Sequence, residues 1–229
     1  PIPKILVTNK IDNWNIFEHP PSKRLSYDYF NQLDKAIETS NFICANSLKI
    51  LVVNPYYGGS LPTAKYCMSA LNDMGHHAES VECEKFVEGF FSIKKITQNK
   101  FNEQALSNQF ASFIGQFIAA KAADFEPDLI LSIAQAPLTP ESIKNLRSLN
   151  VPIAFWFVED FRALPYWKEV TSYYDYFFTI QRGEFFENLA NSGAKNYYYL
   201  PQACLPELHK SIRLTPDDIN RYSSDVSFM

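Results

Sequence analysis

The sequence predicts an α/β protein, with a Rossmann-like, doubly wound parallel sheet of about six strands that follows an N-terminal extension. The first observation is that short apolar runs alternate along the chain with segments of helical periodicity, as in strands joined by crossover helices. The second is that the first of these runs, at 49–53, is mostly apolar, which is typical of a strand buried on both faces of a sheet. At 229 residues, the chain is long enough for one large domain with an appendage.

Residues 1–47 differ from the rest of the chain, and we interpret them as an extension packed against the main domain. Residues 4–8 could form a short strand, and the polar segment around Pro20-Pro21 indicates a loop. Residues 27–39 predict a helix, because their apolar side chains recur at helical spacing.

The first strand–helix–strand unit follows this extension. The apolar run at 49–53 predicts a buried strand, and the glycine-containing turn after it leads to Ser60, a suitable N-cap for a helix that ends near Met74. Gly75 stands where a helix end favours a left-handed backbone, and residues 77–83 then predict the second strand.

The alternation continues through the rest of the domain. Residues 102–123 predict the longest helix, with one broad apolar face, and Thr139-Pro140-Glu141 indicates the start of another helix that ends near Leu149. Residues 85–100 show a poor pattern, for which we expect a loop with a short helix. The remaining predicted elements are strands at 128–133, 151–158, 174–180 and 196–200 and a short helix at 183–190.

The last residues lead us to expect a second domain beyond this chain. Thr215-Pro216-Asp217-Asp218 is a helix-start pattern, and residues 224–229 would begin a strand that has no partner here. We therefore interpret residues 48–205 as the Rossmann-like domain, and residues 206–229 as a linker plus the first strand of a missing C-terminal domain.

Composition excludes several classes of protein. The formal net charge of −4 is not that of a typical nucleic-acid-binding protein, and 46% hydrophobic residues exclude a disordered chain. No apolar run approaches the roughly 20 residues of a membrane span. The four cysteines form no CxxC pair, so we expect neither a structural metal site nor a disulfide framework, and we expect a cytoplasmic protein.

The turn after the first strand is the first candidate site. Tyr57, Gly58, Gly59 and Ser60 lie between a strand end and a helix start, and ligands of open α/β sheets bind at the carboxyl ends of strands. Glycine at a helix N-terminus lets backbone N–H groups approach a phosphate or carboxylate. The pattern is neither GxGxxG nor a P-loop, and a tight turn without a ligand is an equally good interpretation.

Polar residues also follow the later strands. Glu159 and Asp160 follow the fourth strand. A carboxylate there could deprotonate an acceptor hydroxyl, bind a sugar hydroxyl or cap the next helix. The alternative is that both are solvated acids of a loop. Gln135 follows the third strand and could hydrogen-bond a ligand, although a plain loop is slightly favoured. Arg182 follows the fifth strand and could bind an anion, although a surface arginine is the commoner case.

Several segments resemble GT-B glycosyltransferases. Asn54-Pro55 and Gly58-Gly59, then a helix, then Gly75-His76 before a strand are similar to the opening of that fold. The chain from about Leu48 onward resembles the N-terminal half of the CgeB-like (spore maturation type) family, whereas residues 1–47 do not. The later segments that carry this resemblance are residues 155–160, 175–176, 193–195 and 199–209.

The resemblance implies two Rossmann-like domains that face a cleft, with the acceptor held by the N-terminal domain and the nucleotide-sugar donor mostly by the missing C-terminal one. It implies a bacterial, hexosyltransferase-like enzyme that moves a sugar to a hydroxyl acceptor, with neither a metal nor another cofactor. By position, Gly58 and Gly59 match the loop near the donor phosphates, and Glu159 and Asp160 match the acidic strand end. We expect this chain alone to be inactive, because half of the cleft is missing.

The alternative is a non-catalytic, flavodoxin-like binding or sensor module that uses the same loop for a small anion or a partner protein. A glycosyltransferase half predicts that the chain beyond Glu207 runs toward a second domain, whereas a binding module predicts that it packs back. The glycosyltransferase reading requires the turn at 57–60 and the Glu159 carboxylate to lie together at one pocket.

Overall fold

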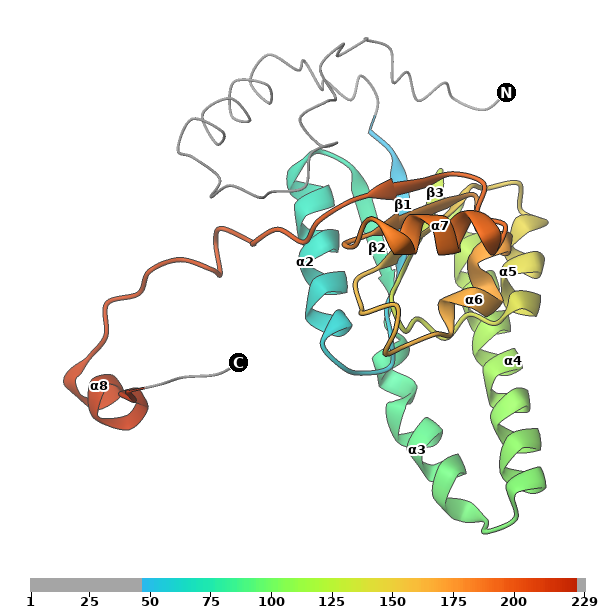
Figure 1. Cartoon of the computed structure of the whole chain (residues 1–229), viewed down its shortest axis with the longest axis horizontal. Coiled ribbons are helices and arrows are strands. Elements are labelled where there is room, and N and C mark those ends of the chain that lie inside the picture. Colours follow the sequence, from blue (N-terminus) through green and yellow to red (C-terminus); the bar gives the residue numbers. More distant parts are fainter. Residues whose placement is uncertain (1–46, 226–229) are drawn as a thin grey trace. The chain divides into compact units, whose positions relative to one another are not determined.

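The computed structural model describes residues 47–225, and in that range it shows one sheet of six parallel strands (Figure 1). The strands are β1 (Lys49–Val53), β2 (His77–Val81), β3 (Leu129–Ile133), β4 (Ile153–Phe157), β5 (Tyr176–Thr179) and β6 (Tyr197–Tyr199). Their order across the sheet is β2-β1-β3-β4-β5-β6, and every neighbouring pair is parallel. The predicted fold class and the places of these six strands are thus confirmed.

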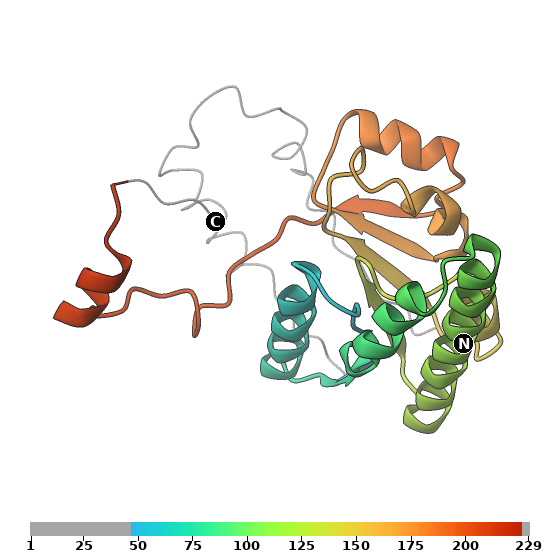
Figure 2. The same ribbon diagram turned by 90° about the horizontal axis from the view of Figure 1, so that it is seen from below.

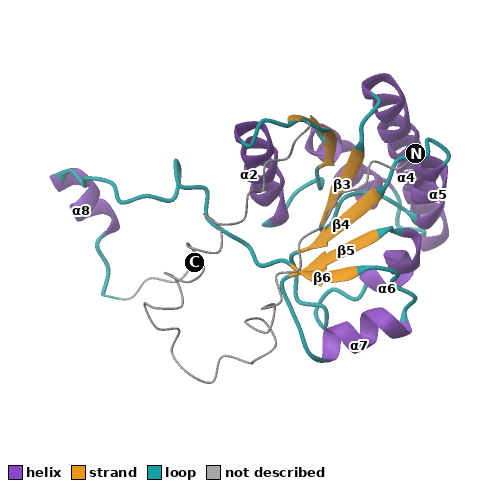
Figure 3. Ribbon diagram, turned by 90° about the horizontal axis from the view of Figure 1, so that it is seen from above, coloured by secondary structure: helices purple, strands orange, loops and turns teal. Residues whose placement is uncertain are grey.

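Helices cover both faces of the sheet, but unequally. The described helices are α2 (Ser60–Asp73), η2 (Cys83–Phe86), α3 (Val87–Ile96), α4 (Lys100–Phe125), α5 (Pro140–Arg147), α6 (Trp167–Val170), η3 (Thr171–Tyr173), α7 (Glu184–Asn191) and α8 (Pro216–Tyr222). The larger core forms where α4, α5, α6 and α7 pack on one face, and α2 packs on the other face over β1, β2 and β3. Figure 3 shows α2 on one side of the strands and α4 and α5 on the other.

Strands β1, β3 and β4 are apolar at nearly every position because each contributes to both cores. In β1, Leu51 and Val53 lie in the larger core, while Ile50 and Val52 lie in the smaller one. Side chains alternate between the two faces of a strand, so a strand covered on both faces needs apolar residues at successive positions. On the face of the sheet that α2 covers, β6 is left uncovered, and its Tyr198 is 49% exposed.

Helix ends follow the local signals in the sequence. The Asn99 side chain accepts hydrogen bonds from the first turn of α4, and the Thr139 hydroxyl accepts one from Ser142 N at 3.1 Å. Gly75, after α2, has the left-handed backbone that was predicted, with φ of +88°. Thr215 caps α8 in a reciprocal capping box with Asp218.

Two predictions about elements need correction. Residues 85–100 are mostly helical, because η2 and α3 continue through Ile96, and Phe90 packs on Tyr56 with ring centroids 4.9 Å apart. The segment that forms α6 and η3 was not predicted as helix. Its buried Trp167 donates its indole N–H to Phe161 O at 2.9 Å, so tertiary packing orders this short segment.

The longest helix, α4, carries the predicted broad apolar face, but that face is only partly buried. Phe113 and Phe117 are 52% and 41% exposed. Both rings contact Phe86 of η2 edge-on, so they pack against a neighbour at the surface without entering the core.

The expectations for the two ends of the chain fall mainly outside the described residues. These include the strand at 4–8, the helix at 27–39 and the last four residues of the strand expected at 224–229. Residues 224 and 225 are described and are not in a strand. Helix α8 has no buried residue, while His209 before it contacts the ring of Tyr66 in α2, with centroids 5.3 Å apart.

Candidate functional site

The turn between β1 and α2 requires glycine at one position. Gly58 has φ of +95°, a backbone conformation that side chains disfavour, and a Cβ there would lie 2.9 Å from Gln135 Oε1. Behind the turn, Tyr56 is buried against Phe90 and Phe110. The turn is therefore held against the end of β3, and a side chain at position 58 would require the Gln135 side chain to shift.

Ser60 does not cap α2 as was predicted. The N-cap is Gly59, no side chain accepts a capping hydrogen bond, and Ser60 is the first helical residue. The Ser60 hydroxyl donates instead to Glu159 Oε1 at 2.5 Å, across 99 residues of chain. Ser60 is 1% exposed and Glu159 is half-buried, and this hydrogen bond joins the turn after β1 to the end of β4.

Gln135, which follows β3, is the second donor to this carboxylate. Its side-chain Nε2 donates to Glu159 Oε1 at 3.1 Å. Its backbone is left-handed, with φ of +65°, which costs a residue other than glycine about 1–3 kcal/mol unless its surroundings impose it. Here the Gln135 N–H donates to the Tyr166 hydroxyl at 2.7 Å, and this hydrogen bond helps to hold the unusual backbone.

Tyr166 keeps its proton in this environment. Burial of the ring raises the pKa of Tyr166 well above its usual range, and the nearby Glu159 raises it further. The phenol therefore stays neutral while it accepts from Gln135, which avoids placing a second negative charge beside the carboxylate. Sequence reasoning missed Tyr166, because nothing in the local pattern indicates its contact with a residue 31 positions earlier.

Ser60, Gln135 and Glu159 together form what we call the carboxylate cluster. The cluster lies where ligands of open α/β sheets bind, because β1 and β3 are neighbours whose crossover helices, α2 and α5, cover opposite faces. Since the strands are parallel, the turn after β1 and the residues after β3 and β4 meet at the carboxyl edge of the sheet. The expected proximity of the 57–60 turn and Glu159 is thus what the structure shows.

Asp160 and Arg182 have other contacts. The Asp160 carboxylate accepts from Arg162 N at 2.9 Å and from the Arg162 guanidinium, which holds the pKa of Asp160 below its usual value. It is an exposed carboxylate that orders the turn after β4, one of the alternatives considered for it. The Arg182 guanidinium lies over the Tyr199 ring of β6, 3.8 Å from the centroid.

Tyr57 lies at the surface of the turn, away from the hydrogen bonds of the cluster. Its ring is 44% exposed and pairs with Phe91 of α3, with centroids 5.0 Å apart. An aromatic pair therefore borders the glycine turn.

Asn54, at the start of the turn, carries an acceptor without a partner. The residue is 1% exposed, and its Nδ2 donates to Glu84 Oε2 at 3.2 Å. Its Oδ1 receives no hydrogen bond from any residue in the described part of the chain. Buried polar atoms of this kind are uncommon and call for a donor. The sequence signal for Asn54 was its place directly after a buried strand.

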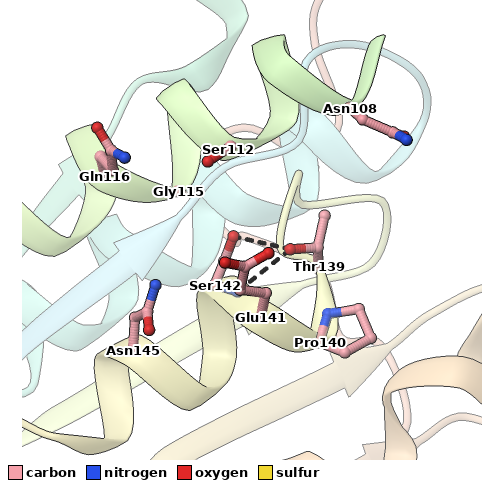
Figure 4. Close-up of a pocket in the computed structure, with 9 residues that line it drawn as sticks. All are labelled: Asn108, Ser112, Gly115, Gln116, Thr139, Pro140, Glu141, Ser142 and Asn145. Carbon is pink, nitrogen blue, oxygen red and sulfur yellow. Dashed lines mark hydrogen bonds between the residues drawn. The ribbon is translucent and has the colours of Figure 1, made fainter. Parts of the chain in front are cut away.

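A separate polar cavity of about 350 Å³ lies between α4 and α5. Figure 4 shows polar side chains lining it from both helices, with the Thr139 and Ser142 hydroxyls hydrogen-bonded to each other at 2.9 Å. The helices approach closely there, since a Cβ at Gly115 would lie 2.2 Å from Ser142 Oγ. No member of the carboxylate cluster lines this cavity, and sequence reasoning did not find it.

Within residues 47–225, no group of three or more His, Cys, Asp or Glu side chains is placed to hold a metal ion. No helix in this range is long and apolar enough to cross a membrane. Comparison of the chain with protein-family models, with curated proteins and with solved structures found no match. The fold and site define an open, parallel α/β domain with a hydrogen-bonded carboxylate at its topological switch point.

Proposed function

We propose that residues 48–205 are the acceptor-side domain of a GT-B glycosyltransferase, which moves a sugar from a nucleotide-sugar donor to a hydroxyl acceptor. The observation that carries the proposal is the meeting of three strand ends on one carboxylate. Ser60 and Gln135 both donate to Glu159 Oε1 at the switch point of the sheet.

Glu159 is the general base in this proposal. Its Oε1 accepts hydrogen bonds from two donors, and in this proposal Oε2 takes the proton of the acceptor hydroxyl. A base must lie within about 2.6–3.2 Å of the oxygen whose proton it removes. The acceptor oxygen then bonds to the anomeric carbon of the donor sugar, the bond from that carbon to the phosphate oxygen breaks, and the proton passes to Glu159.

The glycine turn approaches the donor in this proposal. Gly58 and Gly59 carry no side chains, and they precede the N-terminus of α2, where backbone N–H groups favour an anion such as the leaving diphosphate. The base and ribose of the donor would bind to the second, C-terminal domain.

Turnover of a nucleotide-sugar panel tests this function. The chain would be assayed joined to the donor-side domain, and in parallel as the 229-residue chain alone. We expect hydrolysis or transfer with at least one donor for the joined protein and none for the single domain. Absence of turnover with every donor in the presence of varied hydroxyl acceptors would contradict the proposal.

A second candidate is the flavodoxin-like binding module, which one observation favours. The order β2-β1-β3-β4-β5 is the flavodoxin-like order, here extended by β6. In that case the glycine turn binds a small anion in the single domain. Calorimetric titration of the 229-residue chain with a nucleoside diphosphate separates the two candidate functions. Tight binding would mean that this domain itself recognises the anion, as the binding module requires.

A further inference from the structure

A helical hairpin projects from the sheet edge that carries the candidate site. Helix α3 begins directly after η2, which follows the end of β2, and α4 returns the chain to β3. Figures 1 and 2 show α3 beside α4, and in Figure 1 their joined ends extend beyond the strands. We call residues 94–106 at this end the hairpin tip.

The tip exposes large apolar side chains that the rest of the domain does not cover. Phe101 is 80% exposed, Ile96 is 72% exposed and Leu106 is 37% exposed. Phe101 lies in the first turn of α4, which the Asn99 side chain caps by accepting from Phe101 N at 2.9 Å. The exposed ring is therefore presented by an ordered helix start, on a helix that continues for 26 residues.

The tip is also basic in a protein that is acidic overall. The hairpin tip contains Lys94, Lys95 and Lys100 and one acid, Glu103, whereas the whole chain carries −4. All three lysines are exposed. The nearest acid, Glu103, is paired with Lys100 at 2.8 Å, so Lys94 and Lys95 carry the net positive charge of the tip.

We propose that the hairpin tip docks on the surface of an anionic lipid bilayer. Lysines next to exposed aromatic and aliphatic side chains match such a surface, because the ammonium groups meet the phosphates while Phe101 and Ile96 enter the headgroup–acyl boundary. The tip lies on the bilayer without crossing it. Because the hairpin leaves the carboxyl edge of the sheet, docking turns the carboxylate cluster toward the membrane. The proposal does not depend on the glycosyltransferase function.

Charge complementarity favours an anionic bilayer over a second copy of the chain as the partner of the hairpin tip. Two copies meeting at their tips would bring Lys94 and Lys95 of each close together, and like charges in contact oppose association. A negatively charged bilayer attracts them instead, by roughly a fivefold gain in affinity for each lysine near the surface.

Vesicle co-sedimentation of the 229-residue chain tests the proposal. The probes are neutral phosphatidylcholine vesicles and anionic vesicles that also contain about 30% phosphatidylglycerol. We expect binding to the anionic vesicles only, weakened by high salt. The Lys94→Gln/Lys95→Gln variant should bind roughly 25-fold more weakly, and Phe101→Ser about tenfold more weakly.

Met74→Ser is the matched control, because Met74 is 68% exposed at the end of α2 and follows Asp73 rather than a lysine. It should bind anionic vesicles like the wild type, and circular dichroism should show all variants folded. Absence of wild-type binding, equal binding to both vesicle types, or equal loss in Met74→Ser and Phe101→Ser would overturn the proposal. So would a dimer in sedimentation velocity that Phe101→Ser dissociates, because the tip would then be an interface between copies.

Discussion

Replacement of Gly58 by alanine tests how the glycine turn and the carboxylate cluster depend on each other. The backbone at Gly58 has φ of +95°, and an added Cβ would lie 2.9 Å from Gln135 Oε1. A side chain in this conformation costs about 1–3 kcal/mol, and the close contact adds to that unless the Gln135 side chain moves. If Gln135 moves, its hydrogen bond to Glu159 is stretched or lost.

Gly59→Ala is the matched control one residue further along. Gly59 has φ of −65° in the right-handed region, and an added Cβ would meet nothing within 4 Å. Loss of glycine freedom in the unfolded chain stabilises the variant, while alanine is a poorer N-cap, so we expect a net change of about 0.5 kcal/mol or less.

Urea denaturation followed by circular dichroism measures both variants. We expect Gly58→Ala to unfold at clearly lower urea than the wild type, with a free energy of unfolding lower by at least about 1 kcal/mol, and Gly59→Ala to stay close to the wild type. Equal stabilities for the two variants would refute the reasoning, because the positive φ and the contact with Gln135 would then carry no cost.

Two further predictions concern groups that the structure buries. Tyr166→Phe removes the acceptor of the Gln135 N–H, so it should lower the free energy of unfolding by about 1–3 kcal/mol. Tyr198→Phe is the control and should change this free energy little, because Tyr198 is 49% exposed. Equal effects of the two substitutions would contradict the assigned hydrogen bond. The rate of thiol labelling should distinguish the cysteines. It would be measured in the Cys44→Ser variant, because position 44 lies outside the described residues. Cys204 is exposed, whereas burial raises the pKa of Cys67 to about 11 and that of Cys83 to about 12. Because the thiolate is the reactive form, Cys204 should label first at pH 8 in the native protein, and labelling of Cys83 at a similar rate would show that the core is more open than described.

The sequence was sufficient to predict the strands and their role in the fold. The runs at 49–53 and 129–133 are apolar at successive positions because helices cover both faces of these strands, and that requirement leaves a strong pattern. Helix α3 could not be predicted equally well. Its partners are rings from distant elements, such as Tyr56 beneath Phe90, and local periodicity does not reveal such contacts.

The site was predictable only in part, for a related reason. The carboxyl ends of parallel strands meet at one edge, so residues after β1, β3 and β4 could be expected together, and Glu159 and Gln135 do lie together with Ser60. The role of Ser60 was wrong, because a serine before a helical segment looks like an N-cap whether or not a distant carboxylate accepts its hydroxyl. The left-handed backbone of Gln135 could not be predicted, because glutamine is not a residue type that indicates this conformation.

The rate of sugar transfer by Glu159→Gln beside Asp160→Asn tests the central claim most directly, once a donor is known for the chain joined to the proposed donor-side domain. The two acids are adjacent in sequence, but only Glu159 accepts from Ser60 and Gln135, while Asp160 holds Arg162. General base catalysis contributes about 10²–10⁴-fold, so Glu159→Gln should lower kcat by at least about 100-fold and Asp160→Asn by about threefold or less. Full activity in Glu159→Gln, or a greater loss in Asp160→Asn, would contradict the assignment of this carboxylate.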